Sequence, residues 1–302
     1  MRLFITGISG FVGARLARLA LGHGDAVGGV CLGDRPVPAG VDFTPVDVLD
    51  RAALGAAIER FAPDAVVHLA ALSHVGRSWQ AMGEYFRVNV LGTESLLAAA
   101  AGVGRVVVAS SAEVYGAVPA GEQPIGEERA VAPASPYAMT KAAAERLAIA
   151  AGAVVVRSFN LLGAGQSADF ALPSFARQLA AIARGEREPV LAVGNLSARR
   201  DFLHAGDGAE GYRRLAEAGA RGEVYNLASG AAHSIEEMLH RLMAAAGVEA
   251  RVETDPERLR PVDVPLLCGD AGKLRGLGWA PAHGPDDALT ELWCEALGEA
   301  AA

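Results

Sequence analysis

A tyrosine and a lysine stand one helical turn apart in the segment from Ser135 to Glu145. The pair Ser135-Pro136 predicts the start of a helix, and the residues that follow are strong helix formers. A spacing of four therefore places Tyr137 and Lys141 on the same helix face. A fixed ammonium beside a phenol favours the phenolate, so we expect Lys141 to lower the pKa of Tyr137 from about 10 towards neutrality. Such a phenol exchanges protons with a substrate oxygen.

The alternative is a chance pair on an exposed helix. The composition argues against chance, because the chain has only two lysines, Lys141 and Lys273, and five tyrosines in 302 residues. We therefore interpret the tyrosine and lysine as placed for acid–base chemistry.

A run of hydroxyls and a carboxylate follows the buried strand predicted from Arg105 to Ala109. Ser110, Ser111 and Glu113 stand where open α/β sheets bind ligands, at the carboxyl end of a central parallel strand. The alternative is a serine turn or a helix cap. If the strand is central, these side chains lie within reach of the predicted tyrosine helix.

A glycine-rich turn near the N-terminus links a predicted strand to a predicted helix. Its glycines are Gly7, Gly10 and Gly13, and the helix begins with Phe11 and Val12. A residue without Cβ lets the backbone approach a pyrophosphate, and the N–H groups at a helix N-terminus attract an anion. Glycines also mark ordinary turns in a chain that has 36 of them, so this pattern alone indicates a dinucleotide site only weakly.

Strands and helices alternate along the first half of the chain and beyond. Further strands are predicted at residues 26–32, 41–46, 65–69, 105–109, 154–157 and 223–227, and helices at 51–61, 82–101, 170–184, 207–218, 234–246 and 286–297. This alternation predicts an α/β fold with a doubly wound parallel (Rossmann) sheet and a smaller C-terminal α/β substrate domain. We place the dinucleotide-binding domain at residues 1–163, with 201–227 returning to it, and the substrate domain at 164–200 and 228–302.

The end of the second predicted strand does not select between NAD and NADP. An acidic residue there bonds the adenosine ribose, whereas a basic one accommodates a 2′-phosphate. Cys31 and Leu32 occupy this place, and Asp34 and Arg35 follow them. Either cofactor therefore remains open.

Two polar residues in apolar surroundings are interpreted as structural. His68 ends a strand, and we expect it to bond nearby backbone. Asn89 lies within a predicted helix, and we expect its amide to brace local backbone because buried amides need partners.

The overall composition excludes several classes of protein. A net charge of -8 and a pI near 5.4 argue against a nucleic-acid surface. No apolar run reaches membrane-spanning length and no leader-like segment precedes the first strand, so we expect a cytoplasmic protein. Three widely spaced cysteines indicate reduced thiols rather than disulfides, and we expect no metal site.

Taken together, the glycine turn, the run at residues 68–71, Ser111 and the Tyr137–Lys141 pair resemble the extended short-chain dehydrogenase/reductase (NAD-dependent epimerase/dehydratase) family over essentially the whole chain. The resemblance implies NAD or NADP as cofactor and Tyr137 as proton donor or acceptor. It also implies that Lys141 holds the nicotinamide ribose and that Ser111 bonds the reacting oxygen. The implied cofactor contacts are Gly7, Gly10, Phe11, Val12, Gly13, Asp47, Val48, Leu69, Ala70, Ala71, Tyr137 and Lys141.

Three later stretches, at residues 158–167, 193–202 and 259–265, resemble the branch of this family that acts on GDP-6-deoxyhexoses, and most of all its 4-keto-sugar reductases. The implied reaction transfers a hydride from NAD(P)H to C4 of a GDP-4-keto-6-deoxyhexose, with a GDP-rhamnose type of product. Arg200 and Arg260 are implied to lie near the diphosphate and Asp263 near the nucleoside ribose. The implied substrate contacts are Asn160, Asn195, Arg200, Arg260 and Asp263. The family also implies a homodimer formed through the helices near 82–101 and 137–151.

Other activities remain open. In a 4,6-dehydratase a carboxylate removes the C5 proton, and Glu113 stands close enough in sequence to Ser111 to do so. Ala112 occupies the position of an additional acid found in some sugar dehydratases. A 4-epimerase is a further alternative. A catalytically silent dinucleotide-binding regulator is disfavoured, since it has no use for Tyr137 and Lys141.

Overall fold

The computed structural model describes residues 1–259 and 264–298. Seven parallel strands form its large sheet in the order β10-β6-β5-β4-β1-β2-β3. The strands are β1 (Arg2–Thr6), β2 (Ala26–Cys31), β3 (Asp42–Pro45), β4 (Ala65–His68), β5 (Arg105–Ser111), β6 (Val154–Ser158) and β10 (Val224–Leu227). The order reverses direction between β1 and β4, which defines the point where doubly wound sheets bind ligands at their carboxyl edge. The predicted fold class is confirmed.

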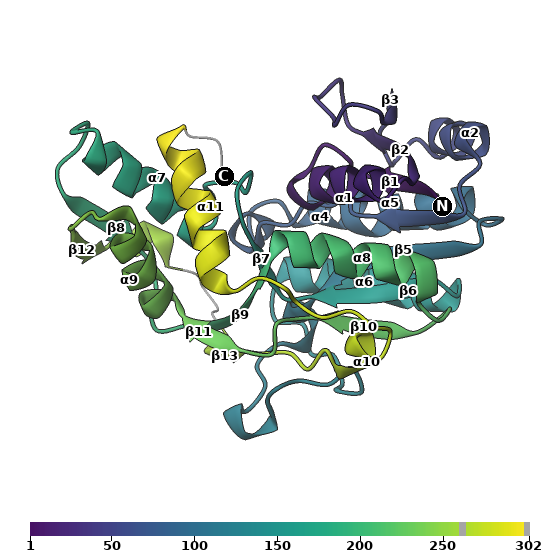
Figure 1. Cartoon of the computed structure of the whole chain (residues 1–302). Helices are drawn as coiled ribbons and strands as arrows, with labels where there is room; N and C mark the ends of the chain where they lie inside the picture. The colour runs from purple at the N-terminus through teal and green to yellow at the C-terminus, as the bar shows by residue number, and fades with distance from the viewer. Residues whose placement is uncertain (260–263, 299–302) are drawn as a thin grey trace.

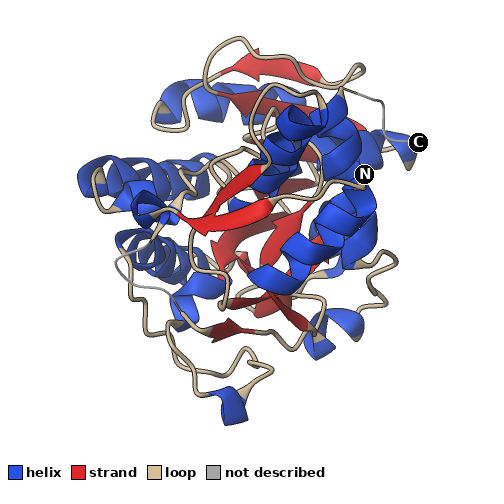
Figure 2. Cartoon of the chain, turned by 90° about the vertical axis from the view of Figure 1, so that its left-hand side faces the viewer, coloured by secondary structure: helices blue, strands red, loops and turns tan. Residues whose placement is uncertain are grey.

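Helices cover both faces of the large sheet (Figures 1 and 2). They are α1 (Phe11–Gly22) and α8 (Ala205–Ala218) on one face, and α2 (Arg51–Phe61), α5 (Gly92–Ala99) and α6 (Pro136–Ala150) on the other. Burial on both sides explains why the central strands are almost continuous valine, because neither face of such a strand meets water.

The local sequence fixes the start of α6. The Ser135 hydroxyl accepts a hydrogen bond from the backbone N–H of Ala138 at 3.1 Å, and Pro136 occupies the first turn, where no N–H partner is needed. The helix therefore begins one residue before Tyr137, and both Tyr137 and Lys141 are buried on the face that packs against β5.

The helix predicted at 82–101 extends from Met82 to Ala99 and contains a π-helical turn. It consists of α4 (Met82–Phe86), the π-helical segment η1 (Arg87–Leu91) and α5. Asn89 lies in η1, where its Oδ1 accepts from Leu72 N at 2.8 Å and its Nδ2 donates to Leu72 O at 3.0 Å. The prediction that Asn89 braces local backbone is confirmed, and so is the helix, in which one wider turn accommodates this inward-facing amide.

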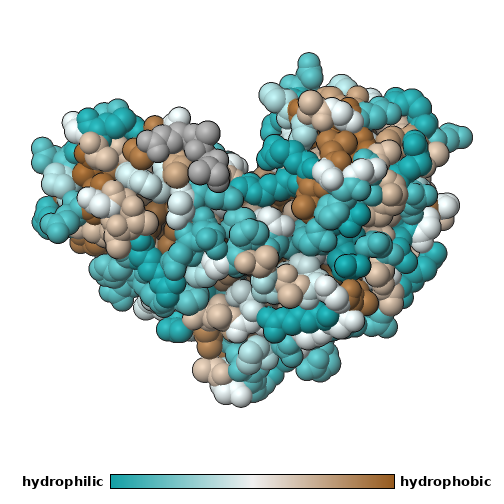
Figure 3. Space-filling view, in the orientation of Figure 1, coloured by the Kyte–Doolittle hydropathy of each residue, from teal (hydrophilic) through white to brown (hydrophobic). Residues whose placement is uncertain are grey.

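A second part of the molecule carries its own core. Its sheets have the orders β11-β9-β13, with β7 also pairing β9, and β12-β8. Its elements are β7 (Asn160–Leu162), β8 (Val190–Val193), β9 (Arg199–His204), β11 (Ala232–Ser234), β12 (Arg251–Thr254), β13 (Leu266–Leu267), α7 (Ala171–Ala183), α9 (Ile235–Ala246) and α11 (Pro285–Leu297). Leucines from all three helices pack together beneath these sheets. Figure 3 shows an open notch between this part and the part that carries the large sheet.

Short elements complete the described chain. They are α3 (Val75–Ser78), α10 (Gly272–Arg275) and the 3-10 turns η2 (Ala112–Tyr115), η3 (Ala120–Glu122) and η4 (Pro256–Arg258). Trp279 is buried in the core, and its indole N–H donates to Asp207 O at 3.0 Å. The three cysteines are free thiols. Over residues 1–259 and 264–298, no helix has the length and apolar character needed to span a bilayer.

Candidate active site

The structure brings Tyr137, Ser111 and Glu113 together at the carboxyl edge of the large sheet. Ser111 ends β5, and its oxygen accepts from the backbone N–H of Glu113 at 3.2 Å, which starts η2. The alternative that Ser111 acts as a helix cap is therefore correct for its hydroxyl oxygen. The O–H of the same side chain can still donate a hydrogen bond. The charge of Glu113 and the hydroxyl of Ser111 both act on the Tyr137 phenol. The ring of Tyr85 meets that of Tyr137 edge-on, with centroids 6.5 Å apart.

The sequence predicts a lowered pKa for Tyr137, and this direction is wrong. Burial raises the pKa of the phenol to about 12, and the nearby carboxylate of Glu113 adds to this rise, whereas the Ser111 hydroxyl opposes it. Burial also acts on Lys141, whose pKa falls to about 8. Removing both groups from water outweighs the attraction that the sequence predicted. The free protein therefore holds a neutral phenol, which is the form that donates a proton.

His68 is buried, but it does not bond backbone as expected. Thr93 Oγ1 donates to Asn89 O at 2.6 Å, so it accepts from His68 Nε2 at 3.1 Å. His68 Nδ1 is then the acceptor for Thr6 Oγ1 at 2.7 Å. Burial lowers the pKa of His68 to about 3, so the ring is neutral. The prediction of backbone partners is wrong because two threonine hydroxyls face the strand end, and together they tie β1, β4 and α5 beneath residues 69–71.

The glycine turn has the form that a dinucleotide requires. Gly7 has φ +70°, and a Cβ there would lie 2.9 Å from Ala70 N. A Cβ on Gly13 would lie 2.2 Å from Gly7 O, so larger residues would separate the turn from α1. Gly10 caps α1 without a side chain, and the first turn of α1 has no acidic residue. The N–H groups that open α1 therefore suit a pyrophosphate.

The other predicted cofactor positions lie at the same edge of the sheet. Asp47 follows β3, where its Oδ1 accepts from Leu49 N at 3.0 Å and fixes the turn before α2. Val48 is buried, whereas Leu69, Ala70 and Ala71 are half-buried beside the glycine turn. Small side chains after β4 thus leave the backbone close to this turn.

Three of the predicted substrate residues line one pocket of about 570 Å³, called the large pocket below. They are Asn160 at the start of β7, Asn195 after β8, and Arg200 in β9. Arg200 is buried, and its Nη1 donates to Val264 O at 2.6 Å and to Arg199 O at 2.9 Å. Arg260 and Asp263, the other two predicted substrate residues, lie outside the described residues.

Two arginines that line the large pocket were not predicted from the sequence. Arg77 lies in α3 and pairs with Asp169 at 3.2 Å. Arg258 ends η4, and its Nη1 donates to Ser174 Oγ at 3.1 Å. Neither stands in a recognisable motif, and only the folded chain brings them to the wall that also contains Arg200.

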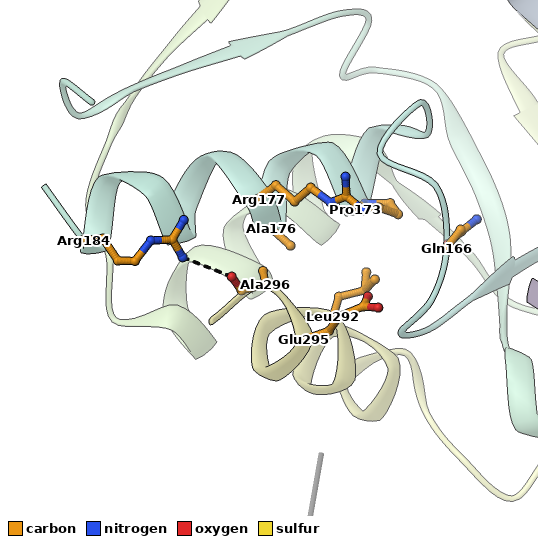
Figure 4. Close-up of a pocket in the computed structure, with 8 residues that line it drawn as sticks. All are labelled: Gln166, Pro173, Ala176, Arg177, Arg184, Leu292, Glu295 and Ala296. Carbon is orange, nitrogen blue, oxygen red and sulfur yellow. Dashed lines mark hydrogen bonds between the residues drawn. The ribbon is translucent and has the colours of Figure 1, made fainter. Parts of the chain in front are cut away.

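A smaller pocket of about 290 Å³ lies between α7 and α11 (Figure 4). Arg177 comes from α7, Arg184 caps the C-terminal end of α7, and Glu295 comes from α11. Arg184 closes one end by donating to Ala296 O at 3.2 Å. None of the predicted site residues lines this pocket, so it adds nothing to the candidate active site.

Comparisons with known proteins agree with this geometry. A family model described as GDP-mannose 4,6 dehydratase matches residues 4–292. GDP-6-deoxy-D-mannose reductase from Pseudomonas aeruginosa is 37% identical over 291 residues, which are 93% of this chain and 92% of that protein. The structure of RMD from Pseudomonas aeruginosa complexed with NADPH is 34% identical, with a TM-score of 0.86 and 99% of both chains covered. A Thermus thermophilus UDP-glucose 4-epimerase complexed with NAD is 30% identical, with a TM-score of 0.89 over 99% of this chain and 100% of that one.

Proposed function

The chain belongs to the GDP-mannose 4,6-dehydratase family of extended short-chain dehydrogenases/reductases, and from this premise we propose that it reduces C4 of a GDP-4-keto-6-deoxyhexose. It is an NAD(P)-dependent nucleotide-sugar enzyme, and its relatives include reductases, dehydratases and epimerases. The observation that favours reduction is similarity to a GDP-6-deoxy-D-mannose reductase over nearly the whole chain, and the buried phenol of Tyr137 beside Ser111 supplies the proton donor that a reduction needs.

The proposed acid–base roles follow from protonation states. The bound nicotinamide cofactor supplies the hydride. A phenol with a pKa of about 12 stays protonated at neutral pH, so Tyr137 donates its proton to the alkoxide that forms at C4. Ser111 donates its O–H to the same oxygen and stabilises the developing charge. Lys141 holds the cofactor ribose and stabilises the phenolate that remains.

The proposed cofactor contacts follow the edge of the sheet. The N-terminus of α1, at Gly10, Phe11 and Val12, holds the pyrophosphate, and Gly7 and Gly13 allow its approach. The remaining contacts are Asp47, Val48, Leu69, Ala70 and Ala71. NADPH and NADH both remain candidates, because relatives of similar fold hold either NADPH or NAD.

The proposed substrate contacts occupy the large pocket. Arg200 binds the diphosphate, since a guanidinium offers paired donors to phosphate oxygens, and Asn160 and Asn195 bond the polar groups of the nucleotide sugar. The roles of Arg260 near the diphosphate and Asp263 near the nucleoside ribose stay predictions.

A dehydratase is the second candidate because of Glu113. Its carboxylate is half-buried and close enough to raise the pKa of Tyr137, and a dehydratase needs such a base for the C5 proton. The test is a panel of nucleotide-linked 4-keto sugars, each assayed for oxidation of NADPH and of NADH, with GDP-mannose alone as the other arm. Oxidation of the reduced cofactor by a GDP-4-keto-6-deoxyhexose supports the reductase. Formation of a keto sugar from GDP-mannose without reduced cofactor shows a dehydratase instead.

A homodimer is also proposed. Met82 and Phe86 on α4, Leu91 on η1, and Met139 and Leu147 on α6 are large apolar side chains exposed to solvent. These elements adjoin each other in the fold, so a second copy would bury one continuous apolar surface. Light scattering of the wild type and of Phe86→Glu tests this, because the dimer predicts that the variant is monomeric. The division into domains at 1–163 with 201–227, and at 164–200 with 228–302, and the cytoplasmic location stay predictions.

A further inference from the structure

A buried carboxylate that the proposed reaction does not use lies on the catalytic face of α6. Glu145 is 2% exposed and stands one helical turn beyond Lys141, the same spacing that separates Lys141 from Tyr137. Residues at this spacing share a helix face. The tyrosine, the lysine and the glutamate therefore form one row along α6.

Glu145 bonds two strands at once. Its Oε2 accepts from Ser110 Oγ at 2.9 Å and from Arg157 Nε at 3.2 Å, and its Oε1 accepts from Arg157 Nη2 at 2.5 Å. Ser110 and Arg157 are register partners on β5 and β6. Because Ser110 directly precedes Ser111, one carboxylate fixes α6 to both strands beside the candidate catalytic serine.

The rest of this helix face gives little directional packing. Ala138, Ala144 and Ala148 are buried there and their methyl groups interlock weakly with a sheet, while Thr140 is buried and accepts from Asn89 Nδ2 at 3.0 Å on the η1 side rather than from the sheet. Contacts made through alanines do little to fix the rotation of a helix against a sheet, whereas charge-assisted hydrogen bonds have a fixed geometry. A misplacement of about 1 Å in an active site lowers the rate by roughly 100-fold.

Glu145 also supplies a negative charge next to two buried cations. Lys141 and Arg157 are both 5% exposed, so two cations share this one carboxylate. Burial lowers the pKa of Lys141 to about 8, and the charge of Glu145 opposes that fall. The other titratable groups beside Lys141 are His68 on β4 and Tyr137 on α6, which are both neutral near pH 7. The negative charge of Glu145 is therefore what favours the ammonium.

We propose that Glu145 is a positioning residue, whose carboxylate sets the rotation of α6 that aims Tyr137 at Ser111 and supplies the negative charge that the Lys141 ammonium faces. The inference rests on the proposed roles of Tyr137 and Lys141 in the reduction. It assigns no direct contact with substrate or cofactor to Glu145.

The test uses the scarcity of lysine in this chain. Protein labelled with ¹³C at the lysine side chains gives signals from Lys141 and Lys273 alone, and Lys273→Arg assigns them. In Glu145→Gln the side chain keeps its shape and loses its charge, so the pKa of Lys141 should fall by about one pH unit. Arg157→Met is the matched control, since it breaks the same ion pair and leaves the carboxylate. It should not lower the pKa of Lys141.

Kinetics supply the second readout. For Glu145→Gln we expect kcat to fall about tenfold, KM for the nucleotide sugar to stay within about twofold, and the alkaline limb of the pH profile to move to lower pH with Lys141. If Glu145→Gln does not fold, Glu145→Gln with Arg157→Met removes the unpaired buried cation, and the same changes are expected.

The outcomes separate the two proposals. An unchanged Lys141 titration in Glu145→Gln, or an equal fall in Arg157→Met, overturns the positioning role. The titration needs no substrate. A wild-type protein that reduces none of the keto sugars therefore refutes the proposed function alone, and leaves the measured effect of Glu145 on Lys141 standing.

Discussion

Lys141 and Glu145 on α6 are buried charged side chains, whereas the large pocket includes an exposed ion pair between Arg77 and Asp169. Lys141 and Glu145 are 5% and 2% exposed. In the large pocket, the side chains of Arg77 and Asp169 are 67% and 41% exposed. Buried charges keep one geometry because no water replaces a lost partner. Exposed pairs exchange partners at little cost. The comparison indicates a preorganised catalytic edge and a pocket in which the exposed Arg77 turns to the ligand when it arrives, whereas the buried Arg200 is already held by two carbonyl groups.

The strongest test of the catalytic edge is Tyr137→Phe. Without the phenolic proton donor, we expect kcat to fall about a thousandfold, with nucleotide-sugar binding unchanged because the large pocket is intact. Turnover with NADPH or NADH and calorimetric binding of the GDP-sugar measure the two effects. Tyr225→Phe, at a buried tyrosine on β10, is the control and should keep its activity. Normal turnover in Tyr137→Phe would remove this residue from the chemistry.

The matching test of the large pocket is Arg200→Met. Loss of charge-assisted hydrogen bonds to the diphosphate should raise KM roughly 10- to 100-fold and change kcat less. The neighbouring Arg199 has an exposed side chain that donates to Ala232 O at 2.8 Å, so Arg199→Met is the control and should leave KM unchanged. An unaltered KM in Arg200→Met contradicts the assignment of this pocket to the nucleotide sugar.

The two regions also differ in how far the sequence predicts them. Tyr137, Lys141 and Ser111 occur in short contiguous motifs, and periodicity alone placed them on a helix and at a strand end. Arg77 and Arg258 reach the large pocket only through the tertiary fold, so no local signal marks them. The predicted direction of the Tyr137 pKa shift was wrong for a related reason. The spacing in the sequence reveals the neighbouring lysine, but it does not reveal that both groups are buried.

The contact between the two parts of the molecule gives a stability test. Glu291 on α11 accepts from Arg15 Nη2 at 2.7 Å, His204 Nε2 at 3.0 Å and Ala164 N at 3.1 Å. Its hydrogen bond with His204 is the largest cause that lowers its pKa to about 2. Because its side chain is only 28% exposed, we expect Glu291→Gln to lower the free energy of unfolding by about 2 kcal/mol.

The difference in stability between the wild type and Glu291→Gln should depend on pH, because the pKa of Glu291 is lowered in the folded state. A carboxylate with a depressed pKa in the folded state stabilises the protein above its ordinary pKa of 4.5, and the contribution is lost as pH falls towards about 2. Melting curves of the wild type and of Glu291→Gln should therefore differ most at neutral pH, approach each other as the pH falls below about 4.5, and converge at about pH 2. A difference in Tm that is constant with pH would mean that the carboxylate charge plays no part.

The smallest effect is expected from an exposed pair of the large pocket. Asp169→Asn removes the charge that Arg77 faces at 3.2 Å. Because exposed ion pairs contribute at most about 1 kcal/mol, Tm should hardly change. The freed guanidinium then meets the diphosphate without a competing carboxylate, so KM should fall by about twofold. Glu253→Gln, in an exposed pair with Arg251 outside the large pocket, should leave KM as it is. If Asp169→Asn instead destabilised the protein as much as a buried substitution, the pocket charges would be as fixed as those of α6, and the contrast between the two regions would disappear.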